Sequence, residues 1–249
     1  MTINLNNISF KFPGTNNAKL FEDFSISLDD STNPIAILGS SGCGKTTLLR
    51  LIAGLIKPHS GSINFCGEQA QADISFVFQE PRLLPHLSVL ENVMLPIEKL
   101  CQSPEQRARR FLALTGLELR ASSYPNELSG GQAQRVSIAR AWAYPAPLII
   151  LDEPFQSLDV PLRIALMDSV LDLIDDCQET CENRFVIAVT HDPREAIYLA
   201  KRIIVLGTDE QKSTKILFDE ESAKSGDAGK REFICADSIE LEKRLIGHL

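Results

Sequence analysis

The stretch "IAILGSSGCGKTT", residues 35–47, places a glycine-rich loop between a run of apolar residues and a segment with helical periodicity. The pattern GxxxxGK[ST] in a strand, loop and helix setting is typical of a phosphate-binding loop. Glycines let successive backbone N–H groups turn toward one anion at a helix N-terminus. We therefore predict a nucleotide phosphate site made by Gly39, Ser40, Ser41, Gly42, Cys43, Gly44, Lys45, Thr46 and Thr47.

Three side chains of this loop have distinct expected roles. Lys45 is expected to meet the β and γ phosphates of ATP, Thr46 to ligate Mg²⁺, and Thr47 to hydrogen-bond the α phosphate. An ordinary glycine turn is the alternative interpretation, and the complete spacing with both flanks argues against it.

A second motif, "LIILDEP" at residues 148–154, ends an apolar run in two adjacent carboxylates. A carboxylate at the end of a strand beside a phosphate loop can hold Mg²⁺ through water, which is the role expected of Asp152. Glu153 can polarise the attacking water. Acidic residues often simply end strands, so the motif gains its meaning from the phosphate loop that precedes it.

A third motif, "LSGGQ" at residues 128–132, lies at the start of a predicted helix. Ser129 and Gln132 have the spacing of a capping box, so a well-capped helix is one interpretation. A cap does not need Gly130 and Gly131, because glycine in a helix costs up to about 1 kcal/mol relative to alanine. The two glycines therefore indicate the close approach of an anionic group.

Two kinds of hydrophobic pattern predict two kinds of sheet. Alternation of apolar and polar residues, typical of half-buried antiparallel strands, involves Ile3, Leu5, Phe24, Ile26, Leu28, Ile63 and Phe65. Continuous apolar runs, typical of a parallel sheet covered on both faces, occupy residues 35–38, 148–151, 185–189 and 203–206.

The segment from about 85 to 145 has helical signals and no strong buried strand, so it is predicted to be a helical insertion in an α/β core. Helix starts are expected at "SPEQ", residues 103–106, and "DPRE", residues 192–195, each with a capping box. We expect one domain over residues 1–217, followed over 218–249 by a polar connection and a short helix near 238–247.

Composition excludes several classes of protein. The formal net charge is −8 and the sequence pI about 5.1, which argues against nucleic-acid binding. The six cysteines show no metal-ligand spacing, and reduced thiols in a cytoplasmic protein are expected. No apolar run reaches the roughly 18 residues that a membrane-spanning helix needs.

Taken together, the motifs resemble those of the ATP-binding cassette (ABC) family over about residues 1–215. The phosphate loop, "LSGGQ" and the carboxylate strand occur in the family's order. "SLD" at residues 157–159 resembles the D-loop, with Asp159 as a nucleotide-site residue. Gln79 resembles the Q-loop glutamine, His191 the switch histidine, and Phe12 the aromatic residue on which adenine stacks.

The resemblance implies a P-loop NTPase (RecA-like) core with an N-terminal antiparallel β subdomain and a helical signature subdomain. It implies a homodimer in which Ser129, Gly130, Gly131 and Gln132 of one subunit bind the ATP held by the other. The implied catalytic residues are Glu153, His191, Gln79 and Lys45, and the implied Mg²⁺ residues are Thr46, Gln79 and Asp152.

The function implied is an ATP hydrolase that drives transport of a small solute through separate membrane permease subunits at the cytoplasmic face of the membrane. Residues 79–93 lie where the family docks its permease. Their sequence is similar to that of the nitrate, sulfonate and taurine importers, which also use a solute-binding protein. The alternative is a soluble cassette ATPase acting on DNA or ribosomes. The solute, the direction of transport and the permease are determined by other chains.

Overall fold

The computed structural model of the chain describes all residues except 14–18, 67–72, 157, 180–183, 211 and 222–235. It divides into two compact units, one formed by Met1–Ala72 with Phe185–Leu249 and the other by Asp73–Arg184. No helix among the described residues is long and apolar enough to cross a membrane.

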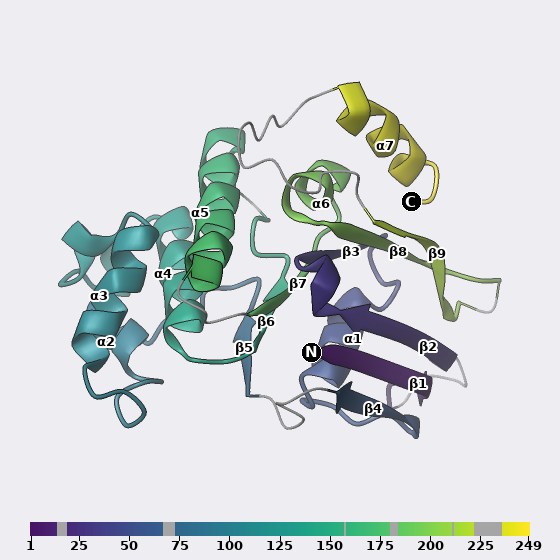
Figure 1. Cartoon of the computed structure of the whole chain (residues 1–249), viewed down its shortest axis with the longest axis horizontal. Helices are drawn as coiled ribbons and strands as arrows, with labels where there is room; N and C mark the ends of the chain where they lie inside the picture. Colours follow the sequence, from purple (N-terminus) through teal and green to yellow (C-terminus); the bar gives the residue numbers. More distant parts are fainter. Residues whose placement is uncertain (14–18, 67–72, 157, 180–183, 211, 222–235) are drawn as a thin grey trace. The chain divides into compact units, whose positions relative to one another are not determined.

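The first unit contains an antiparallel sheet in the order β2-β1-β4 (Figure 1). Its strands are β1 (Thr2–Phe10), β2 (Phe21–Asp29) and β4 (Ser60–Cys66). The register pairs Ile3 with Leu28 and with Phe65, so the alternating apolar residues share a face. The predicted antiparallel strands are therefore confirmed.

A second group of strands in this unit runs in the order β7-β3-β8-β9. Strands β3 (Ile35–Gly39), β7 (Phe185–Val189) and β8 (Arg202–Thr208) are parallel and almost wholly buried, as predicted. Strand β9 (Thr214–Glu221) pairs antiparallel with β8 and was not predicted, because only Thr214 and Phe218 of its residues are buried and no apolar run marks it. The expected domain boundary at residues 217 and 218 falls inside this strand.

Helices α1 (Lys45–Ile52) and α6 (Pro193–Leu199) contact β3, and a 3₁₀ turn, η1, covers Asp30–Thr32. Helix α7 (Ala236–Ile246) packs on α6, where Leu245 is fully buried against the same core cluster as Leu38 and Phe218 (Figure 1). The short C-terminal helix predicted near 238–247 is thereby confirmed, with its start two residues earlier.

The second unit contains the parallel pair β5 (Ile74–Val77) and β6 (Leu148–Asp152). Its helices are α2 (Val89–Met94), α3 (Pro104–Leu114), α4 (Gly130–Ala143) and α5 (Val160–Glu179), with 3₁₀ turns η2 (Glu118–Arg120) and η3 (Pro125–Glu127). Helices α2, α3 and α4 pack on one another, and α4 also contacts β5 and α5 (Figure 1).

Two predicted capping boxes require correction. Helix α3 begins after Ser103 as expected, but the Ser103 side chain makes no cap hydrogen bond because its backbone has φ −131° and ψ 70°. Asp192 does cap α6 by accepting from the N–H of Arg194 at 2.9 Å. The box is not formed, since Asp192 accepts from the second helical N–H instead of the third, which belongs to Glu195. The buried Glu195 carboxylate accepts a hydrogen bond from the Thr190 hydroxyl.

The carboxylate of Asp29 joins the end of β2 to the start of β1. It accepts hydrogen bonds from the Thr2 hydroxyl at 2.7 Å and from the Ser31 N–H at 2.9 Å, and these bonds lower the pKa of Asp29 to about 2. A pKa below the unfolded value of about 3.9 means that the ionised form stabilises the fold. That stabilisation is fully present above about pH 4 and is lost as pH falls through about 2.

We predict that Asp29→Ala lowers the free energy of unfolding at neutral pH and that its difference from the wild type shrinks between about pH 4 and pH 2. Denaturant titrations at several pH values measure this. Thr2→Val, which removes one of the two donors, should move the window to higher pH. A wild-type to Asp29→Ala difference that is constant down to pH 2 would contradict the assignment.

Candidate nucleotide-binding site

The phosphate loop connects the buried strand β3 to helix α1 in the first unit. Gly42 and Gly44 have φ of 85° and 104°, in the left-handed region where a side chain is strained. Helix α1 begins at Lys45, and its N-cap is Gly44. A glycine cap has no side chain to hydrogen-bond the first turn, and the positive end of the helix dipole lies at the loop, where it favours an anion.

Lys45 lies within this loop. Its Nζ donates to the carbonyl oxygen of Gly39 at 2.7 Å and to that of Ser40 at 3.0 Å, and the residue is only 5% exposed. These bonds keep a positive charge next to the first-turn amides of α1. The combination of an ammonium group and a helix N-terminus fits a triphosphate.

Strand β9 holds the loop at Cys43. The hydroxyl of Thr214 donates to the carbonyl oxygen of Cys43 at 2.7 Å, although the two residues are 171 positions apart. Burial raises the pKa of the Cys43 thiol, so this residue packs as a neutral side chain. Sequence reasoning missed Thr214, because a threonine at the start of a polar strand carries no local signal of a role in the site.

Phe12 and His191, the two other predicted residues of this unit, lie near the ends of β1 and β7. Phe12 is 43% exposed and packs edge to face on Phe10, with ring centroids 5.2 Å apart. His191 is exposed, and the residues on either side of it in the sequence are hydrogen-bonded. The buried Thr190 donates from its N–H to the carbonyl oxygen of Ile37 at 3.2 Å and accepts from the Asp192 N–H at 3.1 Å.

In the second unit, the two carboxylates follow one another at the end of β6. Asp152 is the last residue of the strand and is buried, whereas Glu153 is partly exposed with φ 47°. A left-handed backbone is unusual for glutamate and breaks the regular alternation of side-chain directions along the strand. Gln79 donates a side-chain hydrogen bond to Gln156, so the predicted Q-loop residue lies beside the turn that follows Glu153.

The described residues contain no group of three His, Cys, Asp or Glu side chains that could hold a metal ion.

The signature segment forms the start of α4 as predicted. Ser129 is the N-cap, its hydroxyl accepting from the Gln132 N–H at 3.3 Å while the Gln132 side chain accepts from the Ser129 N–H at 3.0 Å. The capping box is confirmed, and both Ser129 and Gly130 are exposed.

The structure separates the two glycines, which the sequence suggested share one role. A Cβ on Gly131 would lie 2.2 Å from Cδ2 of Leu162, so any larger residue there would have to displace the Leu162 side chain of α5. A Cβ on Gly130 would have no atom within 4 Å, so Gly130 leaves open space at the helix start. Only Gly130 therefore keeps room for the approach of an anionic group.

Asp159 caps α5 by accepting a hydrogen bond from the Leu162 N–H at 2.9 Å. Leu162 is thus bonded to the predicted D-loop residue through its backbone and packed on the signature helix through its side chain. Ser157, the first residue of "SLD", lies outside the described residues.

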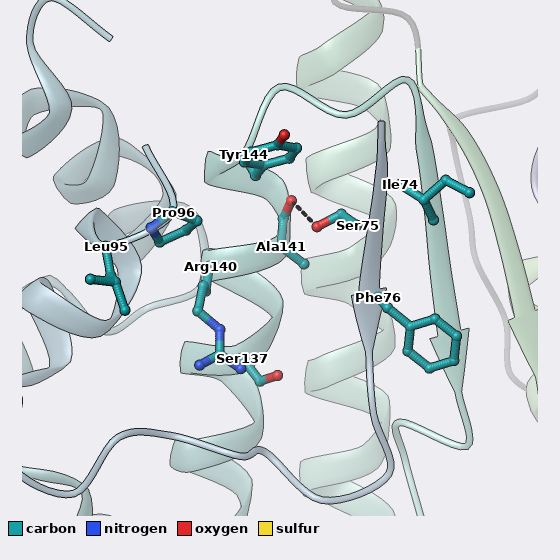
Figure 2. Close-up of a pocket in the computed structure, with 9 residues that line it drawn as sticks. All are labelled: Ile74, Ser75, Phe76, Leu95, Pro96, Ser137, Arg140, Ala141 and Tyr144. Carbon is teal, nitrogen blue, oxygen red and sulfur yellow. Dashed lines mark hydrogen bonds between the residues drawn. The ribbon is translucent and has the colours of Figure 1, made fainter. Parts of the chain in front are cut away.

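The second unit also has a hollow of about 340 Å³ between β5, α4 and the residues that follow α2 (Figure 2). Leu95 and Pro96 line one side, and the Ser75 hydroxyl on the other side donates to the carbonyl oxygen of Ala141 at 2.9 Å. Arg140 lines the hollow and donates to the carbonyl oxygens of Pro81 and Arg82 at 2.9 and 3.1 Å.

The predicted site residues divide between the two units. The first contains Phe12, the loop 39–47 and His191, and the second contains Gln79, residues 129–132, Asp152, Glu153 and Asp159. Each unit brings part of the set together: the loop around Lys45 in one, and Gln79 beside the carboxylate turn in the other. The assigned chemical roles stay predictions.

Comparison with known proteins gives one family. Residues 21–156 match the model of the family described as ABC transporter. The aliphatic sulfonates import ATP-binding protein SsuB 1 of Xanthomonas axonopodis pv. citri is 41% identical over 181 residues, which cover 70% of this chain and 69% of that protein. The sulfate/thiosulfate import ATP-binding protein CysA of Pseudomonas syringae pv. tomato is 37% identical, covering 83% of this chain and 64% of that protein.

Among solved structures, a dimeric ATP-binding cassette in a post-hydrolysis state bound to ADP and Pi is similar, with a TM-score of 0.73 and 29% identity. The match covers 88% of this chain and 98% of that one.

We predict that Gly131→Ala destabilises the protein by about 1–3 kcal/mol, because the added methyl group would overlap Leu162. Gly130→Ala is the matched control: it adds the same methyl group one residue away into open space and should leave the free energy of unfolding unchanged or slightly raised. Denaturant unfolding measures both. Equal stability losses for the two variants would contradict the packing explanation.

Proposed function

This chain belongs to the ABC transporter family as an ATP-hydrolysing subunit, and we propose that it drives the import of a small sulfur oxyanion through separate membrane permease subunits. The observation that carries the nucleotide chemistry is the position of Lys45, whose ammonium lies inside a glycine-rich loop at the start of α1. The two import ATP-binding proteins compared above support the class of solute.

In this proposal, ATP supplies the phosphoanhydride bond whose cleavage releases energy. Lys45 and the first amides of α1 bind the β and γ phosphates and neutralise their charge. Phe12 offers an exposed ring on which adenine stacks. Thr46 of the first unit and Asp152 and Gln79 of the second would be the residues that hold Mg²⁺, with Asp152 acting through water.

Glu153 acts as the general base that polarises water toward the γ phosphate. The residue is partly exposed and has a left-handed backbone, φ 47°, directly after the buried Asp152. His191 steadies the transferred charge and is supported by the hydrogen bonds of the buried Thr190 and of Asp192.

We propose further that two copies of this chain close head to tail on ATP. The N-terminus of α4 is exposed at Ser129 and Gly130 and presents a helix dipole with free space above it. These residues would bind the γ phosphate held by the neighbouring copy, with Asp159 beside them at the start of α5. Hydrolysis would remove the anion that joins the two copies and reopen the dimer.

The permease is proposed to dock on the second unit at residues 79–93 and the adjoining hollow at Leu95 and Pro96 (Figure 2). Leu95 is half exposed there, although it is apolar. The buried Asn92 ties this segment together, since its side-chain amide donates to the carbonyl oxygens of Leu84 and Leu87. Docking would place the chain at the cytoplasmic face of the membrane, and a solute-binding protein would deliver the anion on the other side.

The rival interpretation, a soluble cassette acting on DNA or ribosomes, is not favoured. The named relatives are import ATP-binding proteins, and the net charge of −8 opposes a nucleic-acid partner.

We predict that Glu153→Gln retains ATP and accumulates as an ATP-dependent dimer, because the neutral amide keeps the shape of the site but cannot act as a base. Size-exclusion chromatography with and without ATP measures the dimer. Adding Lys45→Ala to this variant should abolish the dimer by removing the phosphate contact. A Glu153→Gln protein that binds ATP and stays monomeric would contradict closure on ATP.

We also predict that the complex isolated through this subunit contains a membrane permease and that its ATPase activity rises when a sulfonate-loaded binding protein is added. Parallel assays with sulfate, thiosulfate, taurine and nitrate distinguish the possible solutes. Stimulation by nitrate alone would contradict the proposed solute class. Recovery of the chain with nucleic acid and no permease would favour the rival function.

A further inference from the structure

Thr214 is the first residue of β9 and is fully buried. Both of its donors are used by distant segments. Its N–H donates to the carbonyl oxygen of Leu20 at 2.8 Å, just before β2, and its hydroxyl donates to the carbonyl oxygen of Cys43 at 2.7 Å, in the phosphate loop. The residue therefore connects the phosphate loop to β9 and to the segment just before β2.

The bond to Cys43 determines the direction of a peptide plane. In a trans peptide, the carbonyl of one residue and the N–H of the next point in opposite directions. Because the carbonyl of Cys43 is directed at the Thr214 hydroxyl, the N–H of Gly44 is directed away from Thr214. This N–H belongs to the N-cap of α1, where an anion in the loop would be met.

Local chain chemistry alone does not hold that plane. Gly44 has φ 104°, and glycine adopts positive and negative φ with similar ease, so rotation of the peptide between Cys43 and Gly44 has little intrinsic cost. An external hydrogen bond is therefore needed to hold the N–H in one direction. The Thr214 hydroxyl supplies it from a site where water does not compete, since both residues are buried.

The loop packs closely on residue 214 at Gly44. A Cβ on Gly44 would lie 2.9 Å from Oγ1 of Thr214 and 3.0 Å from Cζ of Phe21. The loop thus rests directly on the Thr214 hydroxyl and on the Phe21 ring. A change at residue 214 that keeps the volume but removes the donor would leave the carbonyl oxygen of Cys43 without this buried partner.

We propose that Thr214 is a positioning residue for the phosphate loop, which orients the N–H of Gly44 toward the nucleotide by anchoring the carbonyl of Cys43. Thr214 itself does not touch ATP in this proposal. The inference rests on the proposed function, since it assigns a role in binding a nucleotide at the loop. The proposal adds β9 to the nucleotide-binding site, although β9 contains none of the sequence motifs.

The test compares variants of the full chain by titration with a fluorescent ATP analogue in the presence of Mg²⁺, with competition by unlabelled ATP. Thr214→Val keeps the shape and removes the donor, and it should weaken ATP binding about tenfold, the effect of losing one buried hydrogen bond. Thr214→Ser keeps the donor and should bind ATP within about twofold of the wild type.

Ser213→Ala is the matched control. Ser213 is also buried and adjacent, but within the described part of the chain its hydroxyl has no hydrogen-bond partner. Removing that hydroxyl should leave the Kd for ATP unchanged. If Thr214→Val does not fold, Thr214→Ala and Thr214→Ser give the same comparison, because they differ by one hydroxyl group.

Thermal unfolding without nucleotide separates positioning from stability. The proposal is overturned if folded Thr214→Val binds ATP as tightly as the wild type, or if Thr214→Ser loses as much affinity as Thr214→Val. A wild-type chain that does not bind ATP would overturn the proposed function itself, and the inference with it. A loss of affinity confined to the variants without the hydroxyl supports both.

Discussion

The direction of a few backbone N–H groups between Gly39 and Lys45 is the constraint on which the chemistry of this protein depends. Glycines at 42 and 44 permit the required left-handed backbone, yet the same freedom means that they do not impose it. Three features impose it: a buried strand that fixes the start of the loop, the bonds from Lys45 to two loop carbonyls, and the bond from Thr214 to Cys43.

A comparable constraint operates in the second unit at the starts of two helices. Leu162 donates its N–H to Asp159 and packs its side chain against Gly131, so the beginning of α5 and the beginning of α4 are held together. The two segments proposed to meet ATP from a neighbouring copy are thereby in direct contact. Glycine at 131 serves this contact, and glycine at 130 keeps the space in front of the helix open.

The same helix α4 connects the proposed nucleotide contact to the proposed permease contact. Its N-terminus carries Ser129, and Arg140 near its other end bonds the carbonyl oxygens of Pro81 and Arg82. Arg140 therefore joins the C-terminal part of the signature helix to the segment that follows β5.

The sequence by itself determined the features that short patterns encode. The spacing of glycines and lysine identified the phosphate loop, period-two alternation identified β1, β2 and β4, and continuous apolar runs identified β3, β6, β7 and β8. The reciprocal capping of Ser129 and Gln132 could also be predicted, because both partners lie within one helical turn. Each of these depends on residues that are close along the chain.

Only the tertiary structure decided which residues support those patterns. Strand β9 is identified by its pairing with β8. The packing role of Gly131 follows from its contact with Leu162, and the anchoring role of Thr214 from a hydrogen bond to a residue 171 positions away. Ser103 showed the reverse, since its capping pattern was present but its backbone angles prevented the bond. Such contacts join segments whose local sequences are independent, and folding alone brings their atoms within hydrogen-bonding or packing distance.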